Sequence, residues 1–383
     1  MDPAQTPQPA QRGAGTPAPR GRIAIAMSGG VDSSVAAALL LEEGWEVVGV
    51  HMKLHEAPEG ERRNKSCCSV DDALDARQVC ARLGIPFYVL DYVDVFRERV
   101  IDYFVNAYRA GLTPNPCVMC NQTVKNALLL RQVREFGCDY LATGHYAHIM
   151  PGPEGEAPVL VRPADRRKDQ TYFLFGTPRE ELPWLRFPLA HLDKPQVRAV
   201  AERHGFITWD KPDSQEVCFV PRDTGAFLQG MMKDAPPLPG PFVNRSGEVL
   251  GTHRGLPFYT VGQRRGLGLS APNPVYVLGL RPERNEVVLG EENELLGSSL
   301  RATGVNWVSR EAPSESIEAT VKVRYAHEGT PATITPAEDS QDATAVRVDF
   351  HEPVRAIAPG QAAVFYAGDV LLGGGWIQPE SSR

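Results

Sequence analysis

The sequence has no apolar run near the ~20 residues that a helix needs to cross a bilayer. Its first twenty residues are rich in Pro, Ala, Gln and Gly and lack the apolar centre of a secretory signal, which favours a disordered tail over residues 1–20. Cysteine is also scarce, with seven in 383 residues, an odd number. These absences argue against a membrane protein and a secreted disulfide scaffold. We therefore expect a cytoplasmic protein whose thiols serve chemistry or metal binding.

An excess of positive charge is absent too. The net charge is −7, which excludes a broadly basic, non-specific nucleic-acid binder but leaves room for local basic patches. The remaining composition, 42% hydrophobic and 23% charged, is that of an ordinary globular protein. A chain of 383 residues is too long for one typical core, so the length predicts two or three domains.

Strands that alternate with helices between residues 22 and 146 predict an α/β fold with a parallel sheet and helices on both faces. The Pro-rich stretch Ala235–Pro241 indicates a linker, and short strands follow it, one of them expected at Tyr259–Thr260. Alternating strands from Ile317 to Ile377 predict a β-barrel. The expected divisions are a tail (1–20), a catalytic α/β domain (21–220), a small β-rich central domain (221–295) and a C-terminal β-barrel domain (296–383).

The segment Ser28–Ser34, SGGVDSS, lies between an apolar strand and a helix expected over Val35–Leu41. This arrangement directs backbone N–H groups and a helix dipole at an anion, and its two glycines allow the anion to approach closely. The segment has neither the lysine of a Walker loop nor a GxGxxG pattern. It resembles the pyrophosphate loop of ATP pyrophosphatases, which split ATP into AMP and pyrophosphate, and we use that name for it. Asp32 is its candidate Mg²⁺ ligand.

Thiols occur in two other segments. TPNPCVMCN (Thr113–Asn121) contains a CxxC, and we expect Cys120 to lie just before a helix that begins at Asn121. A helix N-terminus lowers the pKa of a thiol and favours the nucleophilic thiolate. Zinc and redox roles compete for a CxxC, and a third thiol, Cys218, stands within DSQEVCF. The other four cysteines receive no role: Cys67, Cys68, Cys80 and Cys138.

An ordered series of motifs covers nearly everything after the tail. It comprises SGGVDSS, TPNPCVMCN, ATGHY, KDQTYFL, DSQEVCF, YTVGQRRGLGL, KVRY and PGQAAVFY followed by LGGGWI. In this order they resemble the tRNA-specific 2-thiouridylase family, whose members replace O2 of the wobble uridine of certain tRNAs with sulfur. The resemblance implies a tRNA-uridine 2-sulfurtransferase that uses ATP and Mg²⁺. It also implies two kinds of partner, tRNA and a sulfur-donor protein, and no membrane; we expect a monomer.

The resemblance also implies residue roles. In that family, a base carbonyl receives AMP and becomes a good leaving group, while one thiol carries a persulfide and another attacks it. On this chain Cys218 would carry the persulfide and Cys120 would be the nucleophile, with a transient disulfide between them. The implied ATP contacts are Ala26, Met27, Ser28, Gly29, Gly30, Val31, Asp32, Ser33, Met52 and Gly144. The implied contacts to the extruded target base are Asn115, Pro116 and Cys117.

The family resemblance likewise suggests tRNA contacts. These are His145, Lys168, Asp169, Gln170, Arg324, Tyr325 and Gln361. Two basic runs could bind phosphates or simply be solvated, one containing Arg162, Arg166 and Arg167 and the other Arg264 and Arg265. Met52 could equally be a core residue, and His145 a structural one.

The sequence departs from many relatives at Cys117, a position that is often Asp in the family. Cys117, Cys120 and Cys218 could therefore hold a [4Fe–4S] cluster with one open iron, as an alternative to the persulfide route. An adenylating ligase with another acceptor would explain the pyrophosphate loop but not the three thiols. A non-catalytic RNA-binding or zinc protein would leave the intact loop unexplained.

Overall fold

The computed structural model describes residues 20–55, 70–152, 156–213, 217–220, 223–269, 273–337 and 342–379. The expected tail lies almost wholly outside these ranges, as do Cys67 and Cys68. No helix within the described residues is both long enough and apolar enough to pass through a membrane.

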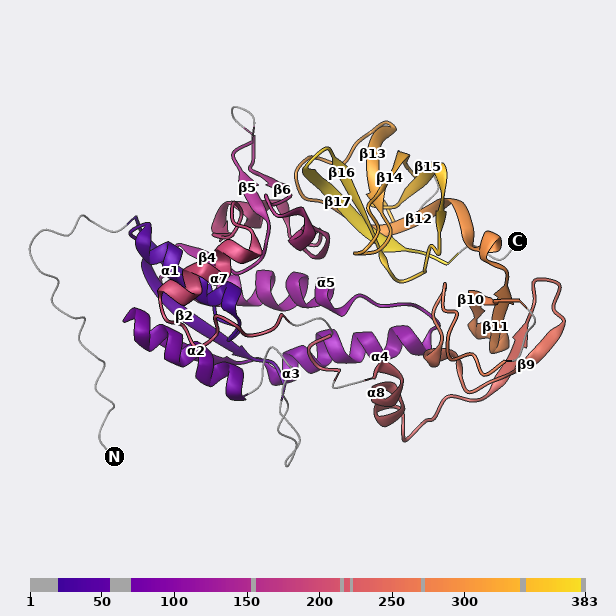
Figure 1. The fold of residues 1–383 in the computed structure, drawn as a ribbon. Helices are drawn as coiled ribbons and strands as arrows, with labels where there is room; N and C mark the ends of the chain where they lie inside the picture. Colours follow the sequence, from indigo (N-terminus) through magenta and orange to yellow (C-terminus); the bar gives the residue numbers. More distant parts are fainter. Residues whose placement is uncertain are drawn as a thin grey trace, which may run out of the picture.

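The first part of the chain forms a five-stranded parallel sheet in the order β3-β2-β1-β4-β7 (Figure 1). Its strands are β1 (Arg22–Ala26), β2 (Glu46–Lys53), β3 (Phe87–Asp91), β4 (Tyr140–Thr143) and β7 (Leu185–Arg186). Alternate residues of β1 face opposite sides, because Ile23 and Ile25 pack into one core and Ala24 into another. This two-sided burial explains why the strand is apolar throughout.

Helices cover both faces, as predicted. On the face of Ile23 lie α1 (Val31–Glu42), α2 (Val70–Leu83) and α7 (Lys194–Arg203). On the other face lie two continuous helical rods, α3-η1-α4 (Val93–Phe96, Arg97–Ile101, Asp102–Arg109) and α5-η2-α6 (Pro116–Cys120, Asn121–Leu129, Leu130–Glu135). The middle segments η1 and η2 are π-helical.

The second rod begins earlier than the sequence predicts. It begins at Pro116 rather than at Asn121, because the side chain of Asn115 caps the helix and Pro116 suits its first position. Cys120 therefore lies inside the helix, and Cys117 occupies the first turn.

The part of the chain between β6 and α7 contains three short 3₁₀ segments, η3 (Arg166–Lys168), η4 (Thr171–Leu174) and η5 (Arg179–Trp184).

The central part of the chain is a small β-rich unit with its own core. Its strands β8 (Gly240–Val243), β9 (Val249–His253), β10 (Tyr276–Arg281) and β11 (Glu286–Gly290) pair in the order β10-β11-β8-β9. The unit also contains η6 (Leu256–Phe258) and η7 (Pro282–Arg284), and helix α8 (Thr224–Met231) precedes it. The strand expected at Tyr259–Thr260 is wrong, because Tyr259 closes η6 and packs into the core.

The C-terminal strands close into an antiparallel barrel, as predicted. After η8 (Glu292–Leu295) come β12 (Leu296–Trp307), β13 (Ile317–Lys322), β14 (Thr330–Pro336), β15 (Val346–Arg355), β16 (Ala362–Ala367) and β17 (Val370–Ile377). Pairing of β12 with both β15 and β17 completes the ring. A hairpin from the first half, β5 (His148–Met150) and β6 (Val159–Val161), joins the same sheet through β17.

Candidate active site

The pyrophosphate loop begins where β1 ends, at the carboxyl edge of the parallel sheet. Ala26 is in register with Val50 of β2 and Thr143 of β4, so β1 and β4 end at the same level while β2 continues to Lys53. Gly144 lies directly against the loop, because a Cβ atom at this position would come within 2.8 Å of the backbone nitrogen of Ser33. Met52 is buried in the adjoining core. The fold thus brings the loop and Gly144 together at the edge where parallel sheets bind ligands.

The local geometry of the loop suits an anion. Gly29 has φ +75°, and a Cβ there would overlap the backbone of Asp72, so only glycine fits. Gly30 precedes α1 and provides no side-chain cap, which leaves the first-turn amides of this helix directed at the loop. The hydroxyls of Ser28 and Ser33 lie 3.2 Å apart beside it. A phosphate group at the loop could accept hydrogen bonds from these amides and hydroxyls.

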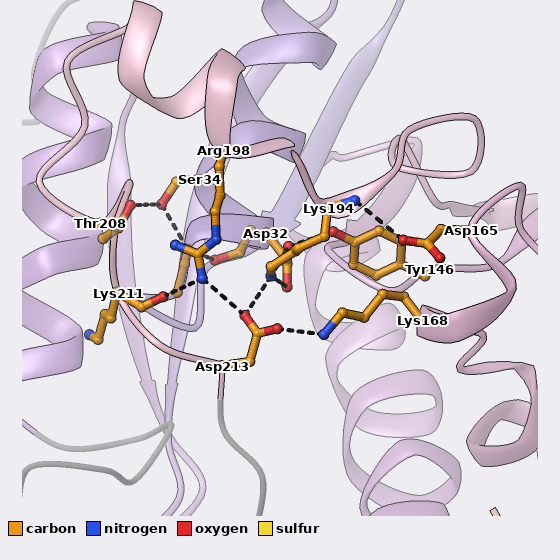
Figure 2. A network of polar contacts seen from close by, with 12 residues as sticks. Asp32, Ser34, Tyr146, Asp165, Lys168, Lys194, Arg198, Thr208, Lys211 and Asp213 are labelled. Carbon is orange, nitrogen blue, oxygen red and sulfur yellow. Dashed lines mark hydrogen bonds and ion pairs between the residues drawn. The ribbon is translucent and has the colours of Figure 1, made fainter. Parts of the chain in front are cut away.

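Asp32 takes part in a polar network across the loop (Figure 2). The ammonium of Lys194 lies 2.8 and 2.9 Å from its two carboxylate oxygens, and the hydroxyl of Tyr146 donates to one of them at 2.9 Å. Burial and the charge of Asp32 raise the pKa of Tyr146, so this phenol remains a donor. Sequence reasoning missed Lys194. The missing Walker lysine was the available signal, because a polyphosphate site without it needs a cation from elsewhere.

Lys194 contacts a second carboxylate, that of Asp213, at 2.6 Å. Lys168 also contacts Asp213 at 2.7 Å, and Arg198 lies 3.8 Å away (Figure 2). Burial raises the pKa of Asp213, but hydrogen bonds from the two lysines outweigh it and bring the pKa below its ordinary value. The carboxylate is therefore ionised at neutral pH.

Segment 208–213 is tied to the pyrophosphate loop at two further points. The hydroxyl of Thr208 donates to Ser34 at 3.2 Å, and the ammonium of Lys211 donates to the carbonyl of Gly29 at 2.9 Å. Lys211 also pairs with Asp72 and Asp75 of α2, at 2.7 and 2.6 Å. The segment that leads toward Cys218 is therefore anchored to the loop.

The thiols occupy different environments. Cys117 is exposed in the first turn of α5, whereas Cys120 is buried in the core beneath it. Cys218 is half-buried and packs against the same core. Its neighbour Phe219 anchors this segment, with its ring 5.2 Å from Phe104 and 5.7 Å from Phe96.

The C-terminal barrel contacts the loop that precedes α5. The amide of Thr113 donates to the carbonyl of Pro359 at 2.8 Å, and the side chain of Gln361 reaches the carbonyl of Pro114 at 3.5 Å. Tyr172 donates to the carbonyl of Ala362 at 3.1 Å. The barrel therefore fixes the position of the thiol-bearing helix at its N-terminal end.

Several of the residues expected to contact tRNA make internal contacts. Asp169 accepts hydrogen bonds from the amide and hydroxyl of Thr171, and Gln170 accepts one from the amide of Tyr146. Arg324 donates to the carbonyl of Arg355. Tyr325 is 40% exposed, and its ring centroid lies 4.7 Å from that of Phe173.

His145 hydrogen-bonds with the hydroxyl of Thr143 at 2.7 Å. Burial, with a smaller contribution from the charge of Lys125, lowers the pKa of His145 well below its ordinary value. Its imidazole is therefore neutral at pH 7, and any contact with RNA would use a neutral ring.

The arginine side chains of the basic run around residue 166 differ in their exposure to solvent. Arg162 lies 4.1 Å above the ring of Tyr366 and pairs with Asp169 at 3.4 Å, which is a packing role. Arg166 pairs with Asp369 of the barrel at 2.5 Å, and Arg167 pairs with Asp165 at 3.4 Å although its own side chain is 80% exposed. Arg264 and Arg265 are also exposed.

The fit of the expected metals differs. Across the described ranges, no three His, Cys, Asp or Glu side chains are grouped so that they could hold a metal ion. Cys117, Cys120 and Cys218 all lie within these ranges and form no such group. Asp32 supplies one carboxylate beside the phosphate-binding amides, which fits a Mg²⁺ ion held chiefly by phosphate oxygens.

Comparison with known proteins accounts for nearly the whole chain. Residues 21–222 match the model of a tRNA methyl transferase HUP domain, residues 225–291 a tRNA methyl transferase PRC-barrel domain, and residues 297–377 an aminomethyltransferase beta-barrel domain. A crystal structure of a 4-thiouridine synthetase–RNA complex with bound ATP is 17% identical, with a TM-score of 0.33, and the match covers 56% of this chain and 51% of that one.

Full-length relatives are much closer in sequence. The tRNA-specific 2-thiouridylase MnmA of Geobacter metallireducens is 50% identical over 364 residues, which cover 94% of this chain and 97% of the relative. The protein of the same name from Symbiobacterium thermophilum is 47% identical over 376 residues, which cover 96% and 94% of the two chains. The chain therefore belongs to the tRNA-specific 2-thiouridylase family.

Proposed function

We propose that this protein is an ATP-dependent tRNA-uridine 2-sulfurtransferase that converts the wobble uridine of tRNA to 2-thiouridine. The observation that carries the proposal is the pairing of two sites in one domain. A phosphate-binding loop lies at the sheet edge, and a capped helix N-terminus presents Cys117 with Cys120 one turn behind it. Cleavage of ATP and sulfur chemistry are thereby supported within one domain.

The ATP site is proposed at the pyrophosphate loop. Backbone amides at the start of α1 would bind phosphate oxygens, and Asp32 would help to hold a Mg²⁺ ion that offsets charge on the departing pyrophosphate. Met27 and Met52, both buried near this edge, would contact the adenine side of the nucleotide, and Gly144 would complete the rim. Ala26, Ser28, Gly29, Gly30, Val31 and Ser33 complete the proposed ATP contacts.

Sulfur transfer is proposed to follow the persulfide route. The thiolate of Cys120 attacks the inner sulfur of a persulfide on Cys218, which forms a Cys120–Cys218 disulfide and releases hydrosulfide. Hydrosulfide adds to C2 of the adenylated base, and AMP leaves with the former O2. A cellular thiol reductant then restores both cysteines, and a sulfur-donor protein supplies the next persulfide. The shared core of Cys120 and Cys218 supports this pairing.

The target base is proposed to lie against Asn115, Pro116 and Cys117 at the N-terminus of α5, where Cys117 is exposed and Asn115 and Pro116 are buried. The tRNA is proposed to extend across the junction with the barrel and to contact Lys168, Asp169, Gln170, Tyr325 and Gln361. His145 and Arg324 complete the proposed contact set. The exposed ring of Tyr325 beside Phe173 is a suitable stacking surface. We further propose a cytoplasmic monomer with domains divided near residues 220 and 295.

The test is release of pyrophosphate from ATP with and without unmodified tRNA, together with detection of 2-thiouridine after addition of sulfide. The proposal predicts pyrophosphate release that depends on tRNA and product that depends on ATP. Cys120→Ser should keep tRNA-dependent pyrophosphate release and lose sulfur transfer from a persulfide. Pyrophosphate release that is indifferent to tRNA would instead indicate an adenylating ligase with another acceptor.

A further inference from the structure

The pyrophosphate loop contains no cation of its own, yet it faces a cluster of three. Lys194, Lys168 and Arg198 converge on Asp213, and Lys194 also contacts Asp32 inside the loop (Figure 2). Within this cluster three positive side chains face two carboxylates, while Lys211, which also contacts the loop, is paired with Asp72 and Asp75. Pyrophosphate carries several negative charges, so this cluster is the complementary half of the loop.

Lys194 is the member best placed to change partners. Its side chain is 11% exposed and starts at the first position of α7, where the side chain of Asp193 caps the helix. The backbone is therefore fixed, while the ammonium lies between a carboxylate in the loop and one outside it, at 2.8 and 2.6 Å. A phosphate at the first-turn amides of α1 would lie beside Asp32 and so within reach of the same ammonium.

We propose that Lys194 is a pyrophosphate-binding residue, and that Asp213 competes with pyrophosphate for its ammonium group. The proposal rests on the proposed function, because it assumes that ATP is cleaved at this loop. When the polyphosphate binds, Lys194 exchanges its contact with Asp213 for one with a phosphate oxygen. Asp213 begins the motif that contains Cys218, so the exchange connects the nucleotide site with the sulfur-carrying segment.

The competition predicts changes of opposite sign, which a purely structural role would not produce. Lys194→Gln should weaken binding of inorganic pyrophosphate about tenfold or more, because a charged hydrogen bond is lost. Asp213→Asn should tighten it about threefold to tenfold, because more of the protein is then ready to bind. Asp213→Glu, which keeps the charge, should bind pyrophosphate within about twofold of the unaltered protein.

The measurement is calorimetric titration of the full chain with inorganic pyrophosphate, at fixed ionic strength and Mg²⁺ concentration, after thermal melting has shown that each variant folds. Asp75→Asn is the matched charge control, because Asp75 is similarly half-buried near the loop but pairs with Lys211, which keeps Asp72. Arg203→Gln is the control for α7, since Arg203 pairs only loosely with Glu42, at 3.8 Å. Neither control should change affinity more than about twofold.

Three results would overturn the proposal. They are unchanged affinity in Lys194→Gln, weaker or unchanged binding in Asp213→Asn, and equal tightening in Asp75→Asn, which would indicate a general effect of charge. If Asp213→Asn does not fold, Asp213→Ser takes its place with the same expectation. tRNA-dependent pyrophosphate release by the unaltered protein is measured in parallel, so failure of the competition is distinguishable from failure of the proposed function.

Discussion

At the scale of single residues, the structure places the cysteines in different environments. Cys117 is exposed in the first turn of a helix, where the dipole favours the thiolate. Cys80 lies fully buried between α2 and the sheet, and burial raises its pKa to about 12. Burial also raises the pKa of Cys138. The thiols of Cys80 and Cys138 therefore stay protonated near neutral pH and are unsuited to thiolate chemistry.

Alkylation with iodoacetamide at pH 8 should reflect this difference. A raised pKa keeps a thiol protonated until the pH approaches that pKa, so only about one Cys80 in ten thousand is ionised at pH 8. Cys117 should react within minutes, and Cys80 should react only after denaturation. Peptide mass spectrometry measures each site, with a urea-treated sample as the control. Equal rates for Cys80 and Cys117 in the folded protein would contradict this assignment.

A second prediction at this scale concerns Gly29. Gly29→Ala should abolish measurable pyrophosphate binding, because the added Cβ would meet the backbone of Asp72 at a positive φ. Gly44→Ala is the matched control, since Gly44 has φ +87° but open space around the added atom. Both variants carry backbone strain, and only the first deforms the loop. Pyrophosphate affinity together with the thermal midpoint tests the difference, and equal affinities would contradict it.

At the scale of elements, the short segment around Cys218 depends on one aromatic side chain. Phe219 is 5% exposed, and its ring packs edge-on against Phe96 and Phe104 of the first helical rod. Phe227 of α8 contacts it from the other side, with the ring centroids 5.6 Å apart. This anchoring ties the segment that contains Cys218 to the core that also holds Cys120.

Phe219→Ala should therefore destabilise the protein by about 3–5 kcal/mol, the usual cost of a large aromatic cavity. It should also slow sulfur transfer more than pyrophosphate release, because the pyrophosphate loop does not use Phe219. Urea denaturation and the two activity assays provide the measurements. Phe136→Ala, at a position that is 49% exposed, should change stability by less than about 1 kcal/mol. Equal losses in both activities would mean that Phe219 serves the whole domain.

At the scale of the whole molecule, the three parts meet around the first domain's helical rods. The end of α4 contacts the central unit, where a Cβ on Gly111 would lie 2.9 Å from Pro282. The barrel contacts the loop before α5, and the β5–β6 hairpin continues the barrel sheet into the first domain. The thiol helix is thereby held from several sides.

Charge reversal at this junction should distinguish a tRNA contact from an internal ion pair. Arg167→Glu should weaken tRNA binding and reduce its dependence on salt, because an exposed cation that neutralises a phosphate is lost. Asp369→Asn is the control: it breaks the pair with Arg166 but keeps both arginines, so tRNA binding should not weaken. Filter binding over a range of salt concentrations measures both. Unchanged affinity and salt slope in Arg167→Glu would refute its role.

The sequence alone sufficed for the features that are local. The alternation of strands with helices indicated the parallel sheet, and SGGVDSS indicated a phosphate-binding turn, because its glycines, hydroxyls and acid lie between an apolar strand and a helix. The ordered motifs also indicated the family. The sequence-based prediction placed the start of this helix at Asn121, five residues after its observed start at Pro116. The capping contact, in which the amide of Val118 donates to the side chain of Asn115, is a weaker sequence signal than the apolar stripe after Asn121.

Only the tertiary structure decided which distant side chains share a site. Lys194 and Asp213 are far from Asp32 in the chain, and no local pattern reveals that their charges converge on the pyrophosphate loop. The same holds for Gln361, which the barrel brings to Pro114, and for Arg162, a basic residue that packs inward. Secondary structure follows from short-range sterics and periodicity, whereas ion pairs between elements depend on how the whole chain closes around its cores.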